Sequence, residues 1–567
     1  MRLLVLAGLT GWVYGDISGF VIVSGSGMPG TPIQGARVHL QADPTIVVFS
    51  AADGSFTLPV SPVGMVTITA ALPHDPANTT NYLTGGVDTV DGASGVTIEL
   101  DELPVADVPF PAPSSAASCA NCHPDQYFGW AFSAHAGAAT DTWVRDLYSG
   151  DGTPGGANGY VFRDLHDPSD TGLCATCHAP LADMLNPGNT FLNDVTDPVA
   201  LEGINCVACH KVSHVNNNVN ALHHLGNATY RFPDGPAPTW RYVWGPLDDV
   251  TFTSMDASYQ PQFSESIFCA SCHQYTNPTT GAPGQSTYDE WLASPFAIAG
   301  PSYQTCQDCH MPTLGAGQVC VVGAPPMRTA PQNLAHGFES ASASGLAAAV
   351  SLSTATSDAA GVLSVVADIS NLALGHDFPT GVSVRNAFVL IEASFNGTPL
   401  VQIGGDTIPF WASDNVPGEQ PGDWAGYPGA GFAKVLQGRI NGIGPVVRPV
   451  LFIDAESVYS DTQIPAGGVG TANVQFEVPY AASAGDTVDV RARLYYRRAW
   501  RSVVVDKGWT QTPQGGEIEL LVGEHITQHQ LADDGVRPTV PTLDLMGVVM
   551  LCGLLGGLAL FYRRRAA

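Results

Sequence analysis

The sequence predicts a multidomain protein with an N-terminal β-sandwich, an irregular, mainly α-helical centre, a C-terminal β-sandwich and one C-terminal transmembrane helix. Three observations support this fold class. Apolar and polar residues alternate between Gly-rich turns at both ends of the chain, but not in its middle. The middle instead carries five copies of Cys-x-x-Cys-His. An uncharged apolar run lies close to the C-terminus.

Both ends of the chain carry targeting signals. Residues 1–15 combine one early positive charge, a short apolar run and small residues before a cleavage point, which predicts a signal peptide. Leu545–Tyr562 has no charge and precedes Arg563–Arg565, which predicts a membrane helix whose arginines stay in the cytoplasm. With the preceding VPTL, this tail resembles the C-terminal sorting signals of bacterial surface proteins. The resemblance implies surface anchoring and a helix that a processing enzyme removes or exchanges. We expect Cys552 to face lipid.

Residues 16–103 are predicted to form the first β-sandwich. TPIQGARVHLQA, SAADGSFTLPV and GMVTITAAL fit short strands with an Asp-Gly turn between them. This stretch resembles the carboxypeptidase regulatory-like domain, which implies a β-sandwich without catalytic residues. His39 and His74 are interpreted as strand or surface histidines rather than ligands. A Pro- and Ala-rich linker, residues 104–118, follows.

Residues 345–523 return to strand patterning and predict the second β-sandwich. GVLSVVADISN, NAFVLIEASFNGTPLVQI and DTVDVRARLYYRRAW fit paired strands, the second with an Asn-Gly turn. We expect a linker at 524–542 and the membrane anchor or sorting tail at 543–567.

The five Cys-x-x-Cys-His motifs predict covalently attached c-type haem. The two thiols bind the haem vinyl groups, and the adjacent histidine becomes an axial ligand of iron. Three alternatives fit the motifs less well. A zinc site needs a second pair of ligands or distant histidines to complete its tetrahedron. A thioredoxin-like protein needs only one dithiol, and a disulfide framework does not place His after every second Cys. Cys320, outside the motifs, is interpreted as a free buried thiol. The predicted thioether cysteines are Cys119, Cys122, Cys174, Cys177, Cys206, Cys209, Cys269, Cys272, Cys306 and Cys309, and the predicted proximal ligands are His123, His178, His210, His273 and His310.

Residues 119–340 are therefore predicted to be a pentahaem domain. Five haems leave about 45 residues each, so porphyrin faces supply much of the apolar core and little regular secondary structure is needed. The segment resembles multihaem cytochromes c of the nitrite-reductase and hydroxylamine-oxidoreductase group in the lines GINCVACHKV, SIFCASCHQ, TYDEWLASPFA and QTCQDCHMP. The resemblance implies haem attachment and redox function. The segment lacks the Cys-x-x-Cys-Lys motif of the catalytic haem in pentahaem nitrite reductases, and this absence disfavours nitrite reduction.

The second axial ligand of each iron decides between electron carrier and enzyme. YFGWAFSAHA and YDEWLASPFA share Tyr-x-x-Trp-x-x-Ser-x-[His/Phe]-Ala, which predicts His135 as a distal ligand and none at Phe296. His376 in LGHDFPTG and His336 in AHGF resemble distal ligands of related multihaem proteins. The remaining candidates are His223 and His224, between which the sequence does not choose, together with His214, His166 and Met255.

These features predict an exported, membrane- or surface-anchored pentahaem cytochrome that relays electrons. The alternative is a multihaem oxidoreductase acting on a small nitrogen or sulfur oxyanion at one five-coordinate haem. The net charge of −29, with 22 Lys and Arg, disfavours nucleic acid and favours a basic redox partner or an extracellular metal-ion acceptor. Homo-oligomers or filaments with haems meeting across interfaces are a third possibility.

Overall fold

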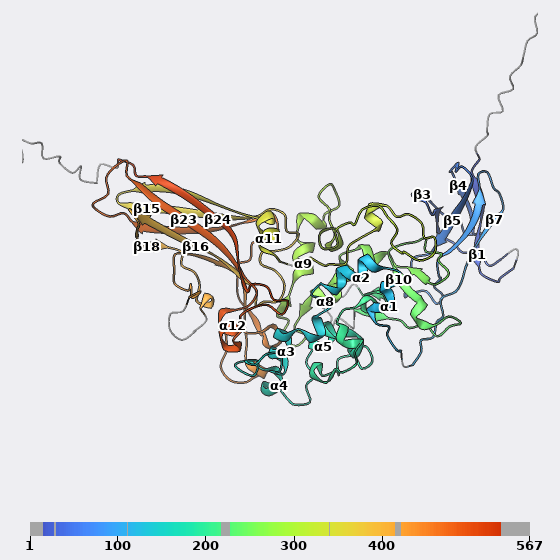
Figure 1. Ribbon diagram of the computed structural model, residues 1–567, viewed down its shortest axis with the longest axis horizontal. Coiled ribbons are helices and arrows are strands. Elements are labelled where there is room, and N and C mark those ends of the chain that lie inside the picture. The colour runs from blue at the N-terminus through green and yellow to red at the C-terminus, as the bar shows by residue number, and fades with distance from the viewer. Residues whose placement is uncertain are drawn as a thin grey trace, which may run out of the picture.

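The computed structural model describes residues 15–27, 30–109, 111–216, 227–339, 341–413 and 421–533. These residues form an elongated molecule with a sheet domain at each end and an irregular segment between them (Figure 1). The predicted signal peptide and the predicted C-terminal membrane helix, with Cys552, lie outside the described residues. In the part of the chain that is described, no helix has the length and apolarity needed to cross a membrane.

The N-terminal domain consists of two sheets that share one hydrophobic cluster. Alternating apolar side chains of both sheets, including Val21, Val38, Ile68 and Ile98, are fully buried in that cluster. One sheet has the order β4-β1-β7 and the other β3-β2-β5-β6. The strands are β1 (Ile17–Val23), β2 (Arg37–Leu40), β3 (Asp43–Phe49), β4 (Ser55–Leu58), β5 (Met65–Ala71), β6 (Gly85–Val90) and β7 (Val96–Leu100).

Charged and aromatic contacts join this domain to the centre. Asp248 accepts hydrogen bonds from Arg37 Nε at 2.7 Å and His39 Nε2 at 3.0 Å. Burial would lower the pKa of His39, but Asp248, the Leu40 carbonyl and Asp249 together outweigh it and raise that pKa above 6.5. Burial would raise the pKa of Asp248, yet the bonds from His39 and Arg37 lower it to about 2. His74 is also buried here and accepts from Trp244 Nε1 at 3.3 Å.

This pairing predicts a pH optimum for docking of the N-terminal domain. The stabilisation from His39 is complete below its ordinary pKa of 6.5 and is lost as pH rises through its raised folded value. The stabilisation from Asp248 is complete above 3.8 and is lost as pH falls towards about 2. We therefore expect docking to be strongest between pH 4 and 6.5. The strength of docking is measured by hydrogen exchange at two amides, His74 and Thr84, which donate to the carbonyls of Tyr259 and Ala257.

An Asp248→Asn variant is expected to lower the free energy of opening at those amides by about 3 kcal/mol, because it leaves a buried cationic partner unpaired. Asp88→Asn is the control, since Asp88 bonds only an exposed Thr67 hydroxyl in the same domain. An opening free energy that is the same at pH 5 and pH 8.5 in the unaltered protein contradicts the prediction.

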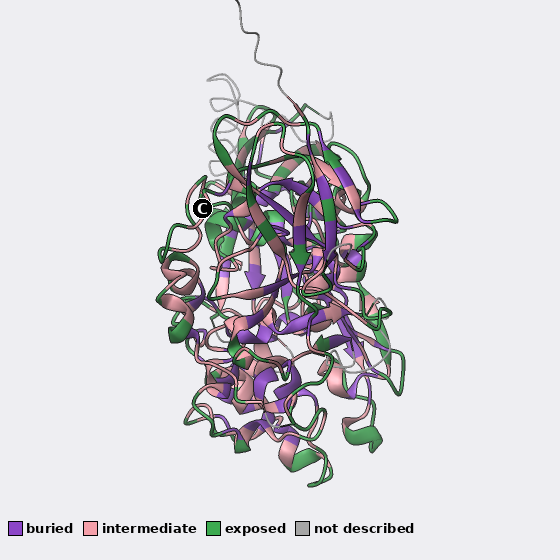
Figure 2. Ribbon diagram, turned by 90° about the vertical axis from the view of Figure 1, so that its right-hand side faces the viewer, coloured by how far each residue is buried: buried purple, intermediate pink, exposed green. Residues whose placement is uncertain are grey.

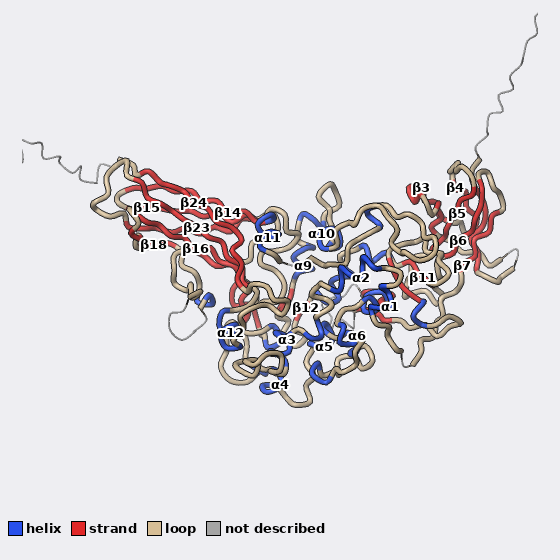
Figure 3. Tube along the Cα trace, viewed as in Figure 1, coloured by secondary structure: helices blue, strands red, loops and turns tan. Residues whose placement is uncertain are grey.

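The central segment contains only short helices and two-stranded ribbons, separated by loops (Figure 3). The longest of its described helices, α2, has eight residues. This agrees with the sparse patterning of the sequence. The elements are α1 (Ala116–Ala120), α2 (Pro124–Ala131), α3 (Thr142–Tyr148), α4 (Phe162–Leu165), α5 (Cys174–His178), α6 (Pro180–Asp183), α7 (Cys206–His210), β8 (Val212–Val215), β9 (Ala228–Tyr230), β10 (Tyr242–Gly245), β11 (Asp256–Tyr259), α8 (Ile267–His273), β12 (Tyr275–Thr276), β13 (Pro283–Gln285), α9 (Thr287–Leu292) and α10 (Cys306–His310).

The C-terminal domain again has two larger sheets around one core of buried residues. Figure 2, in which the right-hand side of Figure 1 faces the viewer, shows buried residues along the strands of the molecule. The sheet orders are β14-β15-β22-β18 and β17-β16-β23-β24, with β19 also pairing β16. Strands β15 and β22 alternate buried and less buried residues, as expected for strands with one face on the core. The elements are α11 (Ala343–Ala349), β14 (Val350–Ala359), β15 (Val362–Asn371), β16 (Asn386–Phe395), β17 (Thr398–Pro399), β18 (Gln402–Gly405), β19 (Gly429–Phe432), β20 (Lys434–Gln437), β21 (Ser457–Asp461), β22 (Val469–Glu477), β23 (Thr487–Arg497), α12 (Arg501–Lys507) and β24 (Glu519–Gln530).

Strand β24 continues past residue 523 into the stretch that the sequence predicts as a linker. His525 and His529 in that extension bond to Thr354 and Thr356 of the neighbouring strand β14. Because the outward positions of this part of β24 are polar, its sequence looks like that of a flexible tail, and the alternating strand pattern is not recognised there.

The C-terminal domain also packs tightly on the central segment. Lys507 is 1% exposed, and its Nζ donates to the carbonyls of Asp146, Gly156 and Tyr160 at 2.5–3.0 Å. Trp509 stacks on Trp143 with ring centroids 4.2 Å apart. The two segments therefore share one continuous interior at this point.

Candidate haem sites

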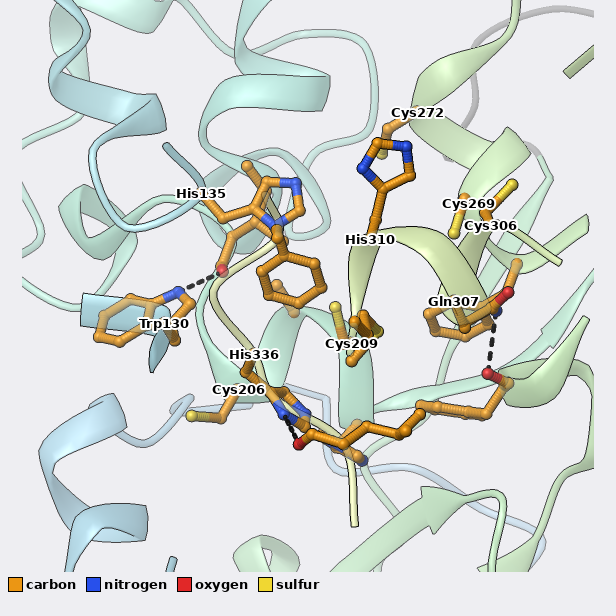
Figure 4. Close-up of a pocket in the computed structure, with 18 of the residues that line it drawn as sticks. Trp130, His135, Cys206, Cys209, Cys269, Cys272, Cys306, Gln307, His310 and His336 are labelled. Atoms are coloured by element: carbon orange, nitrogen blue, oxygen red, sulfur yellow. Dashed lines mark hydrogen bonds between the residues drawn. The ribbon is translucent and has the colours of Figure 1, made fainter. Parts of the chain in front are cut away.

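All five Cys-x-x-Cys-His motifs contribute to the wall of one cavity with a volume of about 1840 Å³. Binding sites for one small ligand usually measure about 300–1,000 Å³, so this cavity exceeds a single site. Cysteines of the third, fourth and fifth motifs surround it together with His135, His310 and His336 (Figure 4). We number the motifs one to five in chain order.

Each motif forms a single helical turn. In the first motif the His123 amide donates to the Cys119 carbonyl at 2.8 Å, and helices α5, α7, α8 and α10 end on the histidines of the other four. A helical turn places residues three and four apart on one face, so both thiols and the imidazole of a motif point the same way. Asn205 caps α7, and Thr305 with Asp308 forms a capping box on α10.

The motif histidines are held by hydrogen bonds at Nδ1. In four of them Nδ1 lies 2.8–3.0 Å from a backbone carbonyl: His123 with Val319, His178 with Ala138, His210 with Trp244 and His310 with Glu339. His273 Nδ1 lies 3.4 Å from the Gln285 amide. Within the described residues none of the five has a hydrogen bond at Nε2. A carbonyl at Nδ1 fixes the proton there and leaves the Nε2 lone pair for a metal, as in haem and other metal proteins.

Burial favours the neutral form of three motif histidines, His178, His210 and His273, and iron ligation requires that form. Burial lowers the pKa of His273 to about 3, with nearby His135 adding to the effect. Burial likewise lowers the pKa of His135 and of His336 to about 4. The pKa values of His178, His210 and His376 are also lowered by burial.

Two pairs of histidines have the separation of axial ligands on one iron. A metal–imidazole bond is about 2 Å long, so two rings on opposite faces of one iron have centroids about 6 Å apart. The rings of His135 and His273 are 6.2 Å apart, and those of His310 and His376 are 6.4 Å apart and nearly parallel. The Nδ1 atom of His135 is buried without a partner. The predicted distal candidates His135 and His376 thus face the fourth and fifth motifs.

The two Tyr-x-x-Trp-x-x-Ser segments adopt the same local structure. Trp130 Nε1 donates to the carbonyl of Ile204, and Trp291 Nε1 to that of Gln304. Each acceptor lies two residues before the first cysteine of a motif. The Ile204 and Gln304 amides bond back to the ninth positions, His135 and Phe296. His135 and Phe296 are therefore equivalent in structure as well as in sequence.

His376 reaches the cavity on a loop of the C-terminal domain. Thr380 of that loop bonds to Thr287 and Glu290 of α9, and the Asn371 side chain donates to the His376 carbonyl. Gly375 packs against Trp291 and Phe296. The loop thus places His376 beside the position where the second Trp segment carries phenylalanine.

His336 and Met255, two further predicted candidates, also lie on the cavity wall. His336 bonds the Leu334 carbonyl through Nδ1 at 3.1 Å, as the motif histidines do with other carbonyls. Electrostatic coupling to His210 and His123 places it on the side of the first and third motifs. In Figure 4 it lies near Cys206 and Cys209.

Two of the other candidates, His166 and His214, do not lie on the wall. His166 is engaged at both nitrogens, by Phe162 O and by Asp454 Oδ1 at 2.8 Å, so neither lone pair is available to iron. His214 lies in β8 and is not among the cavity-lining residues. His223 and His224 lie outside the described residues.

Thiol contacts show which motifs are neighbours. Cys119 interacts with Cys206, Cys177 with Cys272, and Cys269 with Cys306. These contacts join the first motif to the third, the second to the fourth, and the fourth to the fifth. Cys209 of the third motif also lies within electrostatic range of Cys272. Groups attached at these cysteines would form one connected array.

Some wall residues were not predicted from the sequence. Arg385 and Arg498 line the cavity, and Cys320, predicted as a buried free thiol, is partly buried, lines it too and contacts Cys122. Arg385 directly precedes β16 and Arg498 directly follows β23, so no local motif distinguishes them from surface cations. The GHDFPTG element, which ends four residues before Arg385, is the nearest sequence signal.

Comparison with known proteins finds similarity to cytochromes c. The family described as cytochrome c554 and c-prime matches residues 118–211. A solved structure, a penta-heme cytochrome c552 from Thermochromatium tepidum, is 23% identical, with a TM-score of 0.47, and the alignment covers 73% of this chain and 99% of that chain. No curated protein matches. The family match, the repeated motifs and the opposed histidines support a multihaem c-type cytochrome with covalently bound haem iron, which functions in electron transfer.

Proposed function

We propose that this protein is a pentahaem c-type cytochrome that relays electrons through one array of closely packed haems. The single observation that carries the proposal is the convergence of all five motifs on one cavity. A haem would be bound by the cysteine pair of each motif, with the motif histidine as proximal ligand. When bound, the haem iron supplies the one-electron Fe(III)/Fe(II) couple.

The chain's own residues would determine how each iron is held. His135 and His376 would be the distal ligands at the fourth and fifth motifs, and their ring separations from the motif histidines support this assignment. We assign His336 to the third haem, because its strongest electrostatic coupling to a histidine is with His210. Met255 lines the same cavity and stays a candidate distal ligand without an assigned motif. Two protein ligands per iron favour electron transfer over substrate binding.

The array would connect haems in a different order from the sequence. The thiol contacts join the first motif to the third, and the fourth motif to the second and the fifth. Haems held at these motifs would be neighbours in the same order. The fifth motif has a thiol contact only with the fourth among these, so the fourth motif would hold the haem that links the fifth to the rest.

We further infer that the protein acts outside the cytoplasm and is anchored at a membrane or cell surface. The support is the sequence of the two ends, together with haem attachment to Cys-x-x-Cys-His. A net charge of −29 suits a basic redox partner or a metal-ion acceptor.

One observation favours a second candidate function. Among the described residues, three candidate distal histidines line the cavity, fewer than the five irons proposed, so an oxidoreductase acting on a small oxyanion at one five-coordinate iron is the alternative. Electron paramagnetic resonance of the oxidised protein separates the two functions. Five low-spin signals support the relay, and a high-spin signal that changes with added nitrite or sulfite supports the enzyme.

The relay proposal is tested through His376→Ala. Removing this imidazole leaves the fifth iron with one protein ligand, and we expect one of the five low-spin signals to become high-spin. His525→Ala is the control, because His525 bonds only Thr354 on β14, in the same domain. An unchanged spectrum in the His376 variant, with all haems still attached, would contradict the assignment.

A further inference from the structure

We propose that Arg385 and Arg498 form a carboxylate-binding clamp for the propionates of the fourth and fifth haems. The inference rests on the proposed pentahaem function and names positioning residues that no motif of the chain reveals. Both arginines come from the C-terminal domain. That domain would then hold the array by charge as well as by the imidazole of His376.

The first argument is that these two guanidinium groups lack the partners that other arginines have. Every other arginine of the described chain pairs with a carboxylate or stacks on an aromatic ring, as Arg328 does with Asp249 and Arg163 with Phe191. Within the described residues, Arg385 and Arg498 do neither. The chain has only 22 Lys and Arg against 51 Asp and Glu, so cations without carboxylates are unexpected.

The second argument is that the two cations lie close together on one wall. Both line the cavity. Arg385 donates one bond, from Nη1 to the Thr380 carbonyl at 3.3 Å, and no other hydrogen bond of its guanidinium is found in the described structure. Arg498 is held by the Ala341 and Glu517 carbonyls. Burial and the charge of Arg385 both lower the pKa of Arg498, so the pair repel each other. An anion between them removes that cost.

The third argument concerns position. Arg385 interacts electrostatically with His273 and with His376. These histidines are the proximal ligand of the fourth haem and the distal ligand of the fifth. A guanidinium fork matches a carboxylate in two parallel hydrogen bonds, and each haem carries two propionates. The ligand chemistry is therefore a carboxylate or similar oxyanion, and the haem itself is the source we infer.

Pairing a propionate with arginine favours the Fe(II) state of that haem. Neutralising the carboxylate removes negative charge near the iron, which otherwise stabilises Fe(III). Losing both arginines is expected to shift the Fe(III)/Fe(II) ratio of two haems at least tenfold towards Fe(III) at fixed potential, a fall of about 59 mV in each midpoint.

The experiment compares Arg385→Gln/Arg498→Gln with Arg385→Lys/Arg498→Lys in the full chain. Haem content is counted by intact mass, midpoint potentials are measured by optical redox titration, and propionate bending bands are read by resonance Raman spectroscopy. We expect five haems in every form, two lowered potentials and shifted propionate bands in the Gln form, and smaller changes in the Lys form. Arg491→Gln, whose arginine pairs with Glu524 on the outer sheet, is the control and is expected to leave all potentials unchanged.

Each of the remaining results of this experiment either contradicts or supports a specific part of the proposal. Unaltered protein with fewer than five haems overturns the proposed function and the clamp with it. Five haems with five unchanged potentials in the Gln form overturn the clamp alone. A nitrite- or sulfite-dependent spectral shift that the Gln form loses, without a change in potentials, shows that the arginines bind a free oxyanion and overturns the propionate source. If the Gln form loses haem and the Lys form keeps it, the cationic clamp is supported.

Discussion

Replacing Cys269 and Cys272 by alanine is expected to remove one haem and to isolate the second and fifth haems from the remaining array. The reason is that, among the described thiol contacts, the second motif contacts another motif only through Cys177–Cys272 and the fifth only through Cys269–Cys306. Without the fourth haem, only the first and third haems stay in contact. After pulse reduction we expect two haems to equilibrate in the fast phase and two to be reduced slowly.

The matched control removes a different haem from the array. Cys119→Ala/Cys122→Ala deletes the first haem, whose thiols contact only the third motif and Cys320. Four haems should remain, and all four should equilibrate in the fast phase. Equal fast-phase amplitudes in the two variants would contradict the connectivity that the thiol contacts indicate.

The second large effect is expected at His135. Replacing it by phenylalanine gives the first Trp segment the residue that the second segment already has at Phe296. His135 lies 6.2 Å from His273, so the fourth iron loses its distal ligand. We expect one low-spin signal to become high-spin and that iron to bind carbon monoxide when reduced. All five haems should stay attached, because neither cysteine of the fourth motif is changed.

The chain provides its own control for this substitution. Phe296→His introduces the imidazole at the equivalent position, where the fifth iron already has His310 and His376. No coordination position is then open, and the spectrum should not change. A loss of low-spin signal in the Phe296 variant, or none in the His135 variant, would show that the two Trp segments do not direct their ninth residues as described.

Much of this arrangement follows from local sequence. Strand patterning at both ends predicted sheets there, and the structure confirms sheets in both regions and a mainly irregular centre. The shared Tyr-x-x-Trp-x-x-Ser pattern predicted that His135 would be directed at a haem and that Phe296 would not be a ligand. A repeated local pattern fixes which side chain is presented, because it sets backbone hydrogen bonds such as that from Trp130 to Ile204.

Other features depend on contacts between segments far apart in the chain, which local patterns do not encode. His166 resembled a free ligand until the structure placed Asp454 beside it. The sequence predicts His39 and His74 to be strand or surface histidines; His39 does lie in strand β2, but both are buried where the N-terminal domain meets the centre. The cavity wall provided by Arg385 and Arg498 likewise appears only when the C-terminal domain packs on the motifs.

The account depends most on one haem being covalently bound at each of the five motifs, and the mass of the intact, matured protein tests that claim most directly. We predict the mass of the mature polypeptide plus five haems, retained after denaturation and acid–acetone extraction. A polypeptide mass without added haem, or with fewer than five haems after complete maturation, would contradict the account.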